Sequence, residues 1–323
     1  MNNIIQVALA YLDSVKLSRS ENTARTYTNA LNVFMQILEE KKLPPADTPI
    51  EKLSEEAIVW LATALKDTAP ATERLYLTAT TGFYEYLAAE KLSDINLPRL
   101  RLLIKQRARR PGQRLPQFPR ENIEKVILYA INMVNLPFEG EREQLRHLRD
   151  RAFLLTLADT GLRVHEACGM RRGDVDWSEA RAIIIGKGDK EAVVRFSSRA
   201  VAALKVYLNT RVQLDGASGR PLTSLPLFAR HDKRAGSKVL PMTTTTGRNI
   251  VKQRVQEALG EQAAGTITPH SFRHYFVTTV LRGSGGNLKL AQELARHSNV
   301  QTTSRYAHLA NDELDRGYFE IFE

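Results

Sequence analysis

The chain has 323 residues, of which 43% are hydrophobic, and a formal net charge of +10 at pH 7. This length predicts two domains of ordinary size, each able to bury a core. No run of about 18 apolar residues is present, and acidic Asp13 stands where a signal peptide carries small residues, so we expect a cytoplasmic protein. The single cysteine, Cys168, excludes an internal disulfide and a cysteine-rich zinc site.

Residues 1–98 predict a helical domain. Apolar residues recur at helical spacing in four stretches, over 5–15, 27–38, 58–65 and 75–87. Ser20 and Asn22 are both suited to cap the second stretch, and three prolines between residues 44 and 49 separate it from the third. We therefore expect a four-helix unit.

Residues 99–120, RLRLLIKQRARRPGQRLPQFPR, hold eight basic residues and no acidic residue. A basic, proline-bearing stretch between two more balanced regions predicts an interdomain linker. Basic side chains neutralise DNA phosphates and release their counterions, so we expect this linker to contact nucleic acid; the alternative is a solvated linker that only aids solubility. The residues expected to contact DNA are Arg99, Arg101, Lys105, Arg107, Arg109, Arg110 and Arg114.

Residues 121–323 predict an α+β domain. Two runs rich in β-branched residues, AIII at 182–185 and AVVRF at 192–196, flank the turn GKGDKE and predict a hairpin. Helical patterns follow near 198–212, 246–259, 270–282, 287–296 and 301–308. The expected fold class is mainly α with a small antiparallel β-sheet, and the chain ends in a tail at 309–323.

The motifs present argue against ATP chemistry and against a metal site. No G-x-x-x-x-G-K-[ST] phosphate loop occurs, and GKGDK at 186–190 is a turn with lysines. His270 and His274 stand four apart, as two zinc ligands on a helix do. However, Ser271 stands where a zincin has its glutamate, and Arg273 would hold a positive charge beside the cation. We therefore expect no metal and no cofactor.

A set of polar residues stands out from the helical stripes of the second domain: Arg163, Lys187, His270, Arg273, His297 and Tyr306. Together they meet the demands of phosphodiester cleavage by a tyrosine. Two guanidinium groups can hold the non-bridging oxygens of the transition state, a lysine can protonate the leaving 5′-oxygen, and a histidine can accept the tyrosine proton. Considered individually, Arg163 would more often cap a helix and His270 would more often fill a core position than act in catalysis. Lys190 is the alternative to Lys187.

The second domain resembles the catalytic domain of the tyrosine recombinase (integrase) family. TGLRVHEA resembles the first-arginine motif of that family, PHSFRHYFVTTVL its H-x-x-R motif, and ARHSNVQTTSRYAH its histidine-to-tyrosine motif. The intervals of 24 residues from Arg163 to Lys187 and nine from His297 to Tyr306 are also similar to those of the family. In the first domain, SENTARTYTNALNVF resembles part of the core-binding domain.

The resemblance implies a core-binding (DNA-binding) domain at 1–98, a basic linker at 99–120 and a catalytic domain at 121–323. It implies that Glu166 supports the site by bracing Arg163, that Tyr306 is the nucleophile, and that the scissile phosphate is surrounded by Arg163, Lys187, His270, Arg273 and His297. The implied intermediate is a 3′-phosphotyrosyl link, which needs neither ATP nor metal. This sequence departs from the family at two positions: His165 replaces a small residue, and Arg296 stands where glycine normally precedes the histidine.

The resemblance also implies a double-stranded DNA recombination site as partner, with four copies assembled on it and no membrane. We expect the apolar tail to dock onto a neighbouring subunit; the alternative is that it folds back onto its own domain. Because the chain begins at the core-binding helices, we expect a Xer-like or cointegrate-resolving role, or the integration of a mobile element, over phage integration with accessory arm sites. The alternatives are a type IB topoisomerase-like or telomere-resolving enzyme, and a non-catalytic DNA-binding regulator.

Overall fold

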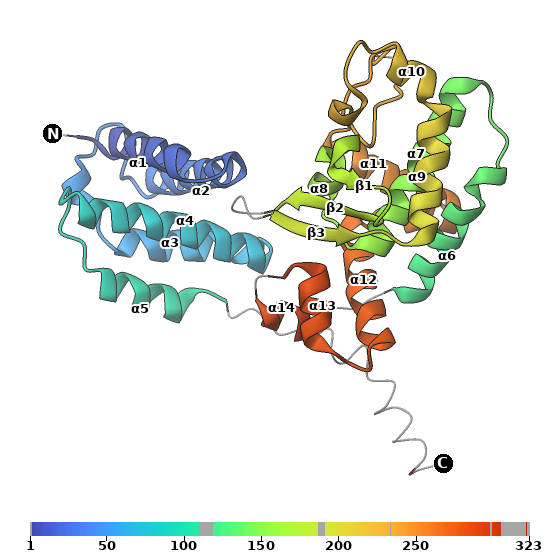
Figure 1. The fold of residues 1–323 in the computed structure, drawn as a ribbon. Helices are drawn as coiled ribbons and strands as arrows, with labels where there is room; N and C mark the ends of the chain where they lie inside the picture. The colour runs from blue at the N-terminus through green and yellow to red at the C-terminus, as the bar shows by residue number, and fades with distance from the viewer. Residues whose placement is uncertain are drawn as a thin grey trace. The chain divides into compact units, whose positions relative to one another are not determined.

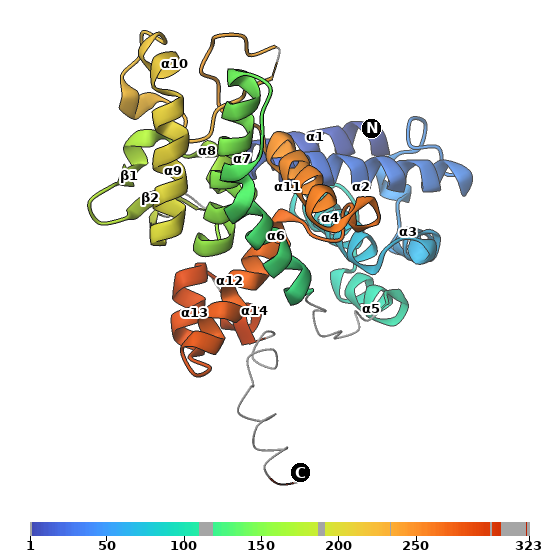
Figure 2. The ribbon, with the colours of Figure 1, turned by 90° about the vertical axis from the view of Figure 1, so that its right-hand side faces the viewer.

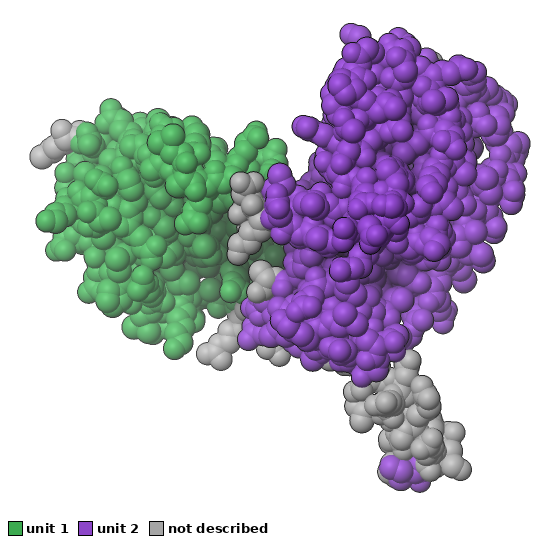
Figure 3. Space-filling model, in the orientation of Figure 1, with its two compact units in different colours: residues 1–114 green, residues 115–323 purple. Residues whose placement is uncertain are grey.

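The computed structural model describes residues 2–109, 119–186, 191–232, 234–297, 299–304 and 321. The chain forms two compact units, Met1–Arg114 and Leu115–Glu323, which Figure 3 colours green and purple. Each unit has a buried core of its own, as expected for separate domains. Within the described ranges, no helix has the length and apolar character needed to cross a bilayer.

The first unit is helical, as predicted. Its first four α-helices match the four predicted apolar stretches: α1 Ile4–Ser18, α2 Glu21–Glu40, α3 Glu56–Ala64 and α4 Pro70–Ala89. A further helix, α5 Leu97–Arg107, follows them. Helix α2 packs against α1 and α4, and α3 packs against α5 (Figure 1).

Short polar side chains fix where these helices begin. Of the two predicted caps, Ser20 caps α2 by accepting a hydrogen bond from the Thr23 backbone N–H, and Asn22 lies within the helix. Asn3 caps α1 by accepting one from the Gln6 N–H at 2.8 Å, and the Gln6 side chain accepts one in return from the Asn3 N–H. Caps of this kind stabilise a helix by about 1 kcal/mol each.

Aromatic side chains fill the centre of the first unit. Phe34, Phe83 and Tyr84 are fully buried, and the Tyr84 hydroxyl donates a hydrogen bond to the Ser54 carbonyl at 2.8 Å, so its burial leaves no unpaired polar atom. Leu100 of α5 is fully buried in the same core. The first half of the predicted linker is therefore a helix that packs on the first unit.

The second unit is also mainly helical. Its α-helices are α6 Arg120–Asn132, α7 Glu141–Thr160, α8 Val164–Gly169, α9 Ser198–Thr210, α10 Val212–Gly216, α11 Thr244–Leu259, α12 Pro269–Gly283, α13 Leu288–Ala295 and α14 Val300–Ser304. Figures 1 and 2 both show α12, α13 and α14 beside one another, in agreement with their contacts. The predicted helical patterns near 198–212, 246–259, 270–282 and 287–296 coincide with α9, α11, α12 and α13. Of the pattern near 301–308, residues 301–304 lie in α14 and residues 305–308 lie outside the described residues.

A small antiparallel sheet lies beside these helices. Its strands are β1 Val175–Asp176, β2 Arg181–Ile185 and β3 Glu191–Arg195, in the order β1-β2-β3, with Ile183 opposite Val193. The predicted hairpin and the predicted fold class are confirmed. Residues on one face, including Ala182, Ile184 and Val194, are buried, whereas Ile183 and Val193 on the other face are exposed, as the two-residue period of a strand requires.

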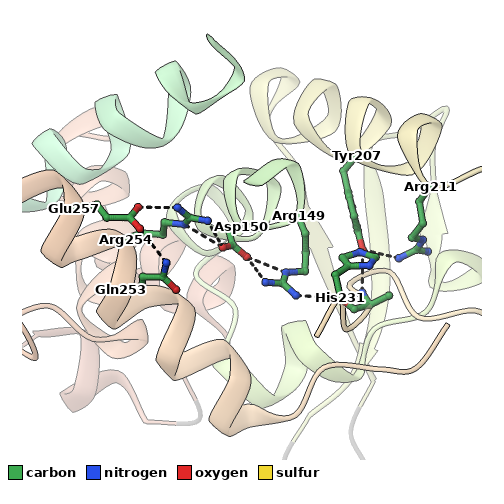
Figure 4. Close-up of polar contacts among 9 residues, drawn as sticks. Arg149, Asp150, Tyr207, Arg211, His231, Gln253, Arg254 and Glu257 are labelled. Atoms are coloured by element: carbon green, nitrogen blue, oxygen red, sulfur yellow. Dashed lines mark hydrogen bonds and ion pairs between the residues drawn. The ribbon is translucent and has the colours of Figure 1, made fainter. Parts of the chain in front are cut away.

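Buried charged side chains join the helices of the second unit (Figure 4). The Asp150 carboxylate on α7 accepts hydrogen bonds from Arg149 at 2.6 Å and from Arg254 on α11 at 2.7 Å. Arg254 also donates to Glu257 at 2.7 Å. Asp150 is 2% exposed, so its charge requires these partners to offset the loss of hydration.

Replacing Asp150 by asparagine removes the negative charge that lies between two buried guanidinium groups. We expect the free energy of unfolding of the second unit to fall by about 3–5 kcal/mol. Urea unfolding can be followed by fluorescence of Trp177, with Trp60 replaced by phenylalanine so that the signal reports this unit. Glu293→Gln, which removes the exposed pair with Lys289, is the control and should cost less than about 1 kcal/mol. Equal losses in the two variants would contradict the role of Asp150.

Candidate active site

The turn between α7 and α8 begins the site. Gly161 ends α7 in the left-handed region at φ 59°, and a Cβ placed there would lie 2.5 Å from the Phe276 ring. Glycine is therefore required for both its backbone conformation and its size. Leu162 is buried, and Arg163 follows as the N-cap residue of α8. This short turn brings the Arg163 side chain out of the core, and it is 39% exposed.

Glu166, in the first turn of α8, binds Arg163 twice. Its carboxylate accepts hydrogen bonds from the Arg163 backbone N–H and from Arg163 Nη1, each at 2.8 Å. Burial alone would raise the pKa of Glu166, but the backbone hydrogen bond from Arg163 and the positive charges of Arg296 and Arg163 hold that pKa below its ordinary value. The carboxylate is therefore ionised at neutral pH.

Arg273 on α12 connects two turns of the site. Its side chain is buried; Nη1 donates to the Gly161 carbonyl at 2.6 Å, and Nη2 donates to the Ala295 carbonyl at the end of α13. The first of these carbonyls belongs to the turn before Arg163, and the second belongs to the turn before His297. Arg273 thus fixes the two turns relative to each other.

His270 lies one turn before Arg273 on α12. Its ring meets the His274 ring edge to face, with centroids 4.2 Å apart. Desolvation and the positive charges of Arg273 and Arg163 lower the pKa of His270. Within the described ranges, no three or more histidine, cysteine, aspartate or glutamate side chains are grouped to hold a metal ion.

His297 follows α13 in a tight turn. Arg296 adopts the left-handed conformation at φ 57° and ψ 44°, which costs a non-glycine residue roughly 1–2 kcal/mol. Gln292 donates a side-chain hydrogen bond to the His297 carbonyl at 3.1 Å. His297 Nδ1 and the Thr303 hydroxyl of α14 form a hydrogen bond of 2.8 Å. Hydrogen bonds thus fix both the backbone of His297 and its imidazole ring.

Burial and the positive charge around it determine the protonation of His297. Burial lowers the pKa of His297 to about 4, and the charges of Arg273, Arg163, Arg296 and His270 act in the same direction. The imidazole is neutral at pH 7 and has a lone pair that can accept a proton. Two arginines and a neutral histidine within one cluster can bind a phosphate group and remove a proton from an attacking hydroxyl.

The structure therefore brings together five of the predicted site residues, namely Arg163, Glu166, His270, Arg273 and His297. Lys187 and Tyr306 lie outside the described residues, as does the tail at 309–323 apart from Ile321. The catalytic roles of all seven stay predictions.

Comparison with known proteins assigns the chain to a family. Residues 132–313 match the phage integrase family. The chain belongs to the phage integrase family. It is 29% identical over 324 residues to Tyrosine recombinase XerC of Bacillus subtilis (strain 168), covering 98% of this chain and 95% of that relative. The predicted family and the predicted activity class, a site-specific tyrosine recombinase acting on DNA, are confirmed.

Two solved structures have a similar fold. The XerH site-specific recombinase bound to palindromic difH substrate, in a post-cleavage complex, superposes with a TM-score of 0.68 at 18% identity, over 99% of this chain and 96% of that one. The Tn1549 transposon integrase in complex with transposon right end DNA superposes with a TM-score of 0.61 at 20% identity, over 97% and 98% of the two chains. These likenesses support the fold of the recombinase.

Two further residues contact the candidate site and were not among the predicted site residues. Thr303 binds the His297 ring, and Arg296 donates to Glu166 at 3.2 Å. The sequence did give a signal for Arg296, since glycine normally stands at that position in the family. Nothing in the local pattern indicates Thr303, whose role follows from the way α14 packs on α13.

The basic residues predicted to contact DNA differ in their surroundings. Arg99 pairs with Glu56 at 2.6 Å and Arg101 with Glu85 at 2.9 Å, both at the surface. Arg109 binds the buried carboxylate of Glu73, through its backbone N–H at 3.0 Å and through Nε. Among the described residues, Lys105 and Arg107 have no carboxylate at ion-pair distance. Arg110 and Arg114 lie outside the described residues.

The His297 signal in an NMR titration should move with a midpoint near pH 4, whereas an unperturbed histidine titrates near 6.5. Because the pKa is lower in the folded state, this histidine contributes stability above about pH 6.5, and the contribution is lost as the pH falls toward 4. His297→Gln assigns the signal and should weaken the loss of stability over that range. A midpoint near 6.5 would show that neither burial nor the surrounding positive charge lowers the pKa of His297.

Proposed function

We propose that this recombinase cleaves one DNA strand by attack of the Tyr306 hydroxyl on the scissile phosphate. A bond forms between the tyrosine oxygen and phosphorus, and the bond from phosphorus to the 5′-oxygen breaks, which leaves a 3′-phosphotyrosyl link and a 5′-hydroxyl. The tyrosine proton passes to His297 or, through water, to His270. Lys187 protonates the leaving oxygen. Rejoining is the same exchange in reverse, with a 5′-hydroxyl of the partner strand as the attacking group.

The observation that carries this proposal is the fixed placement of Arg163 and Arg273. Arg163 is held by Glu166, and Arg273 by the carbonyls of Gly161 and Ala295, so both side chains are ordered before DNA arrives. The phosphorane-like transition state carries more negative charge than the substrate phosphate. Prepositioned donors stabilise such charge without reorganising during the reaction, an effect of about a hundredfold or more in rate per donor.

The properties of His297 also support its role as the base. A tyrosine hydroxyl has a pKa near 10, so its attack at neutral pH needs a proton acceptor. His297 is neutral in the protein alone because burial and three arginines lower its pKa. A bound phosphate adds negative charge to this cluster, which raises that pKa toward the working pH and makes proton transfer more favourable.

The proposed partner is a duplex recombination site, bound by a homotetramer in which the C-terminal tail docks onto a neighbouring subunit. The basic composition of residues 99–120 supports contact with the DNA backbone. Tyr318, Phe319, Ile321 and Phe322 make the tail apolar, which favours a protein partner for it. We propose a Xer-like or cointegrate-resolving role, or the integration of a mobile element, in the cytoplasm.

The decisive experiment traps the covalent intermediate. Purified protein is mixed with a pool of nicked duplexes that have a randomised central segment, and adducts that survive SDS are isolated and sequenced. Wild-type protein should form adducts that share one sequence, and Tyr306→Phe should form none, because it lacks the attacking oxygen. Tyr129→Phe is the matched control: it removes a hydroxyl bound to Glu257 on α11 and should leave adduct formation intact.

An adduct formed by Tyr306→Phe would overturn the assignment of the nucleophile. If wild-type protein binds the pool but forms no adduct, the proposal of catalysis fails and the regulator alternative stands. A plasmid that carries two selected sites tests the product: recombined circles support the proposed role, whereas relaxation alone would indicate topoisomerase activity.

Lys105 and Arg109 should respond differently to removal of their side chains. Lys105→Ala is expected to reduce the slope of log affinity against log salt by about 1 on duplex DNA, because one phosphate contact is lost. Arg109→Ala should instead lower the free energy of unfolding of the first unit by about 2 kcal/mol or more, because Glu73 stays buried with fewer donors. Filter binding at several salt concentrations and urea unfolding separate the two effects; an unchanged slope in Lys105→Ala would contradict its contact with DNA.

A further inference from the structure

Arg296 combines an unfavourable backbone conformation with a buried side chain. Four non-glycine residues of the described chain have positive φ: Lys42, Lys91, Ala180 and Arg296. Lys42 and Lys91 are exposed at the surface, whereas the Arg296 side chain is only 10% exposed. Its Nε is also buried, with no hydrogen-bond partner among the described residues. Local costs of this kind persist where the surrounding structure fixes a residue in place, often at a functional site.

The contacts of Arg296 lead to the turn that holds Arg163. Nη2 donates to Glu166 Oε2 at 3.2 Å and lies 3.4 Å from the Gly161 carbonyl, to which it also donates. Glu166 uses its other oxygen for the Arg163 guanidinium, and Gly161 is also the acceptor for Arg273. Arg296 thus contacts both the Glu166 carboxylate, which holds Arg163, and the Gly161 carbonyl, which holds Arg273. Glu166 lies 130 residues before Arg296 in the sequence.

We propose that Arg296 is a positioning residue for cleavage: through Glu166 and the Gly161 carbonyl it fixes the His297 turn against the Arg163 turn. The proposal rests on the function proposed above. A glycine would relieve the strain of the turn, but it would leave Glu166 with a single guanidinium partner. The turn that holds His297 could then move relative to Arg163, and small displacements of catalytic groups slow a reaction strongly.

Arg296 also changes the charge that a phosphate meets. If Glu166 pairs with Arg163 alone, one carboxylate offsets one guanidinium. When Arg296 shares the same carboxylate, the three groups together keep one positive charge, close to the exposed Arg163 side chain. This charge favours the transition state over the substrate, since the transition state is more negative.

Single-turnover cleavage of the selected nicked duplex tests the proposal. Arg296→Gly should slow adduct formation by about tenfold to a hundredfold, with affinity for the duplex changed by less than about threefold. Arg296→Lys, which keeps the charge but loses the planar fork, should recover part of the rate. Lys91→Gly relieves the same backbone strain at an exposed site and is the matched control, with cleavage at the wild-type rate.

A double-mutant cycle shows whether Arg296 acts through Glu166. In a Glu166→Gln background, Arg296→Gly should slow cleavage by less than about threefold, because the shared contact is already lost. If the double variant slows cleavage by the product of the two single effects, the two residues act independently and the proposal is overturned. Cleavage at the wild-type rate by Arg296→Gly, or a loss of DNA affinity without a slower cleavage step, would also overturn it. Circular dichroism of each variant identifies misfolding, and Arg296→Lys remains as a test if Arg296→Gly misfolds.

A measurement without DNA keeps this inference separate from the proposed function. His297 faces positive charge from Arg163, Arg273, Arg296 and His270. If Arg296 holds its place beside His297, Arg296→Met should raise the midpoint of the His297 NMR titration, and Arg296→Lys should raise it less. An unchanged midpoint in Arg296→Met would overturn the placement of Arg296 even if cleavage occurs. A raised midpoint with no cleavage by any variant would instead count against the proposed function alone.

Discussion

The site depends on the buried carboxylate of Glu166. A carboxylate that is 1% exposed at its side chain is strongly unfavourable unless charged donors surround it, and here they come from Arg163 and Arg296. The need to satisfy this one charge fixes both arginines, although they lie on segments far apart in sequence. The carboxylate determines where two guanidinium groups stand, and those groups determine the charge of the site.

The second constraint is the turn at Gly161. Its left-handed conformation ends α7, its missing side chain makes room for the Phe276 ring, and its carbonyl accepts from Arg273 and Arg296. Helices α7, α8, α12 and α13 therefore meet at one backbone group. Because a carbonyl has two lone pairs, it can accept both donors, and the Arg273 and Arg296 side chains are thereby attached to the backbone. Rotamer changes at the surface cannot easily disturb such an attachment.

Much of the fold and of the candidate site was predictable from the sequence, because local residue patterns decide the secondary structure and mark the motifs. Helices α1–α4 followed from apolar periodicity, the β2–β3 hairpin from two runs of β-branched residues around a turn, and Arg163 and Arg273 from their motifs. Helix α5 was missed because its basic residues from Arg99 onward are typical of a linker, although Leu100 is fully buried. Strand β1 has two residues, too few to show alternation. The contacts of Arg296 with Glu166 and of Arg109 with Glu73 join residues 130 and 36 positions apart, and no local pattern encodes such pairs.

The arginines of this chain divide by what they bind. Arg149 and Arg254 are buried against Asp150, and Arg109 is bound to Glu73, so their charges are neutralised by carboxylates. At the site, one carboxylate serves Arg163 and Arg296, while Arg273 binds carbonyl oxygens in the contacts described above. Carbonyl oxygens orient a guanidinium without cancelling its charge. Glu166 offsets only one of its two guanidinium partners, so Arg163, Arg296 and Glu166 together keep one positive charge that the fold itself orders.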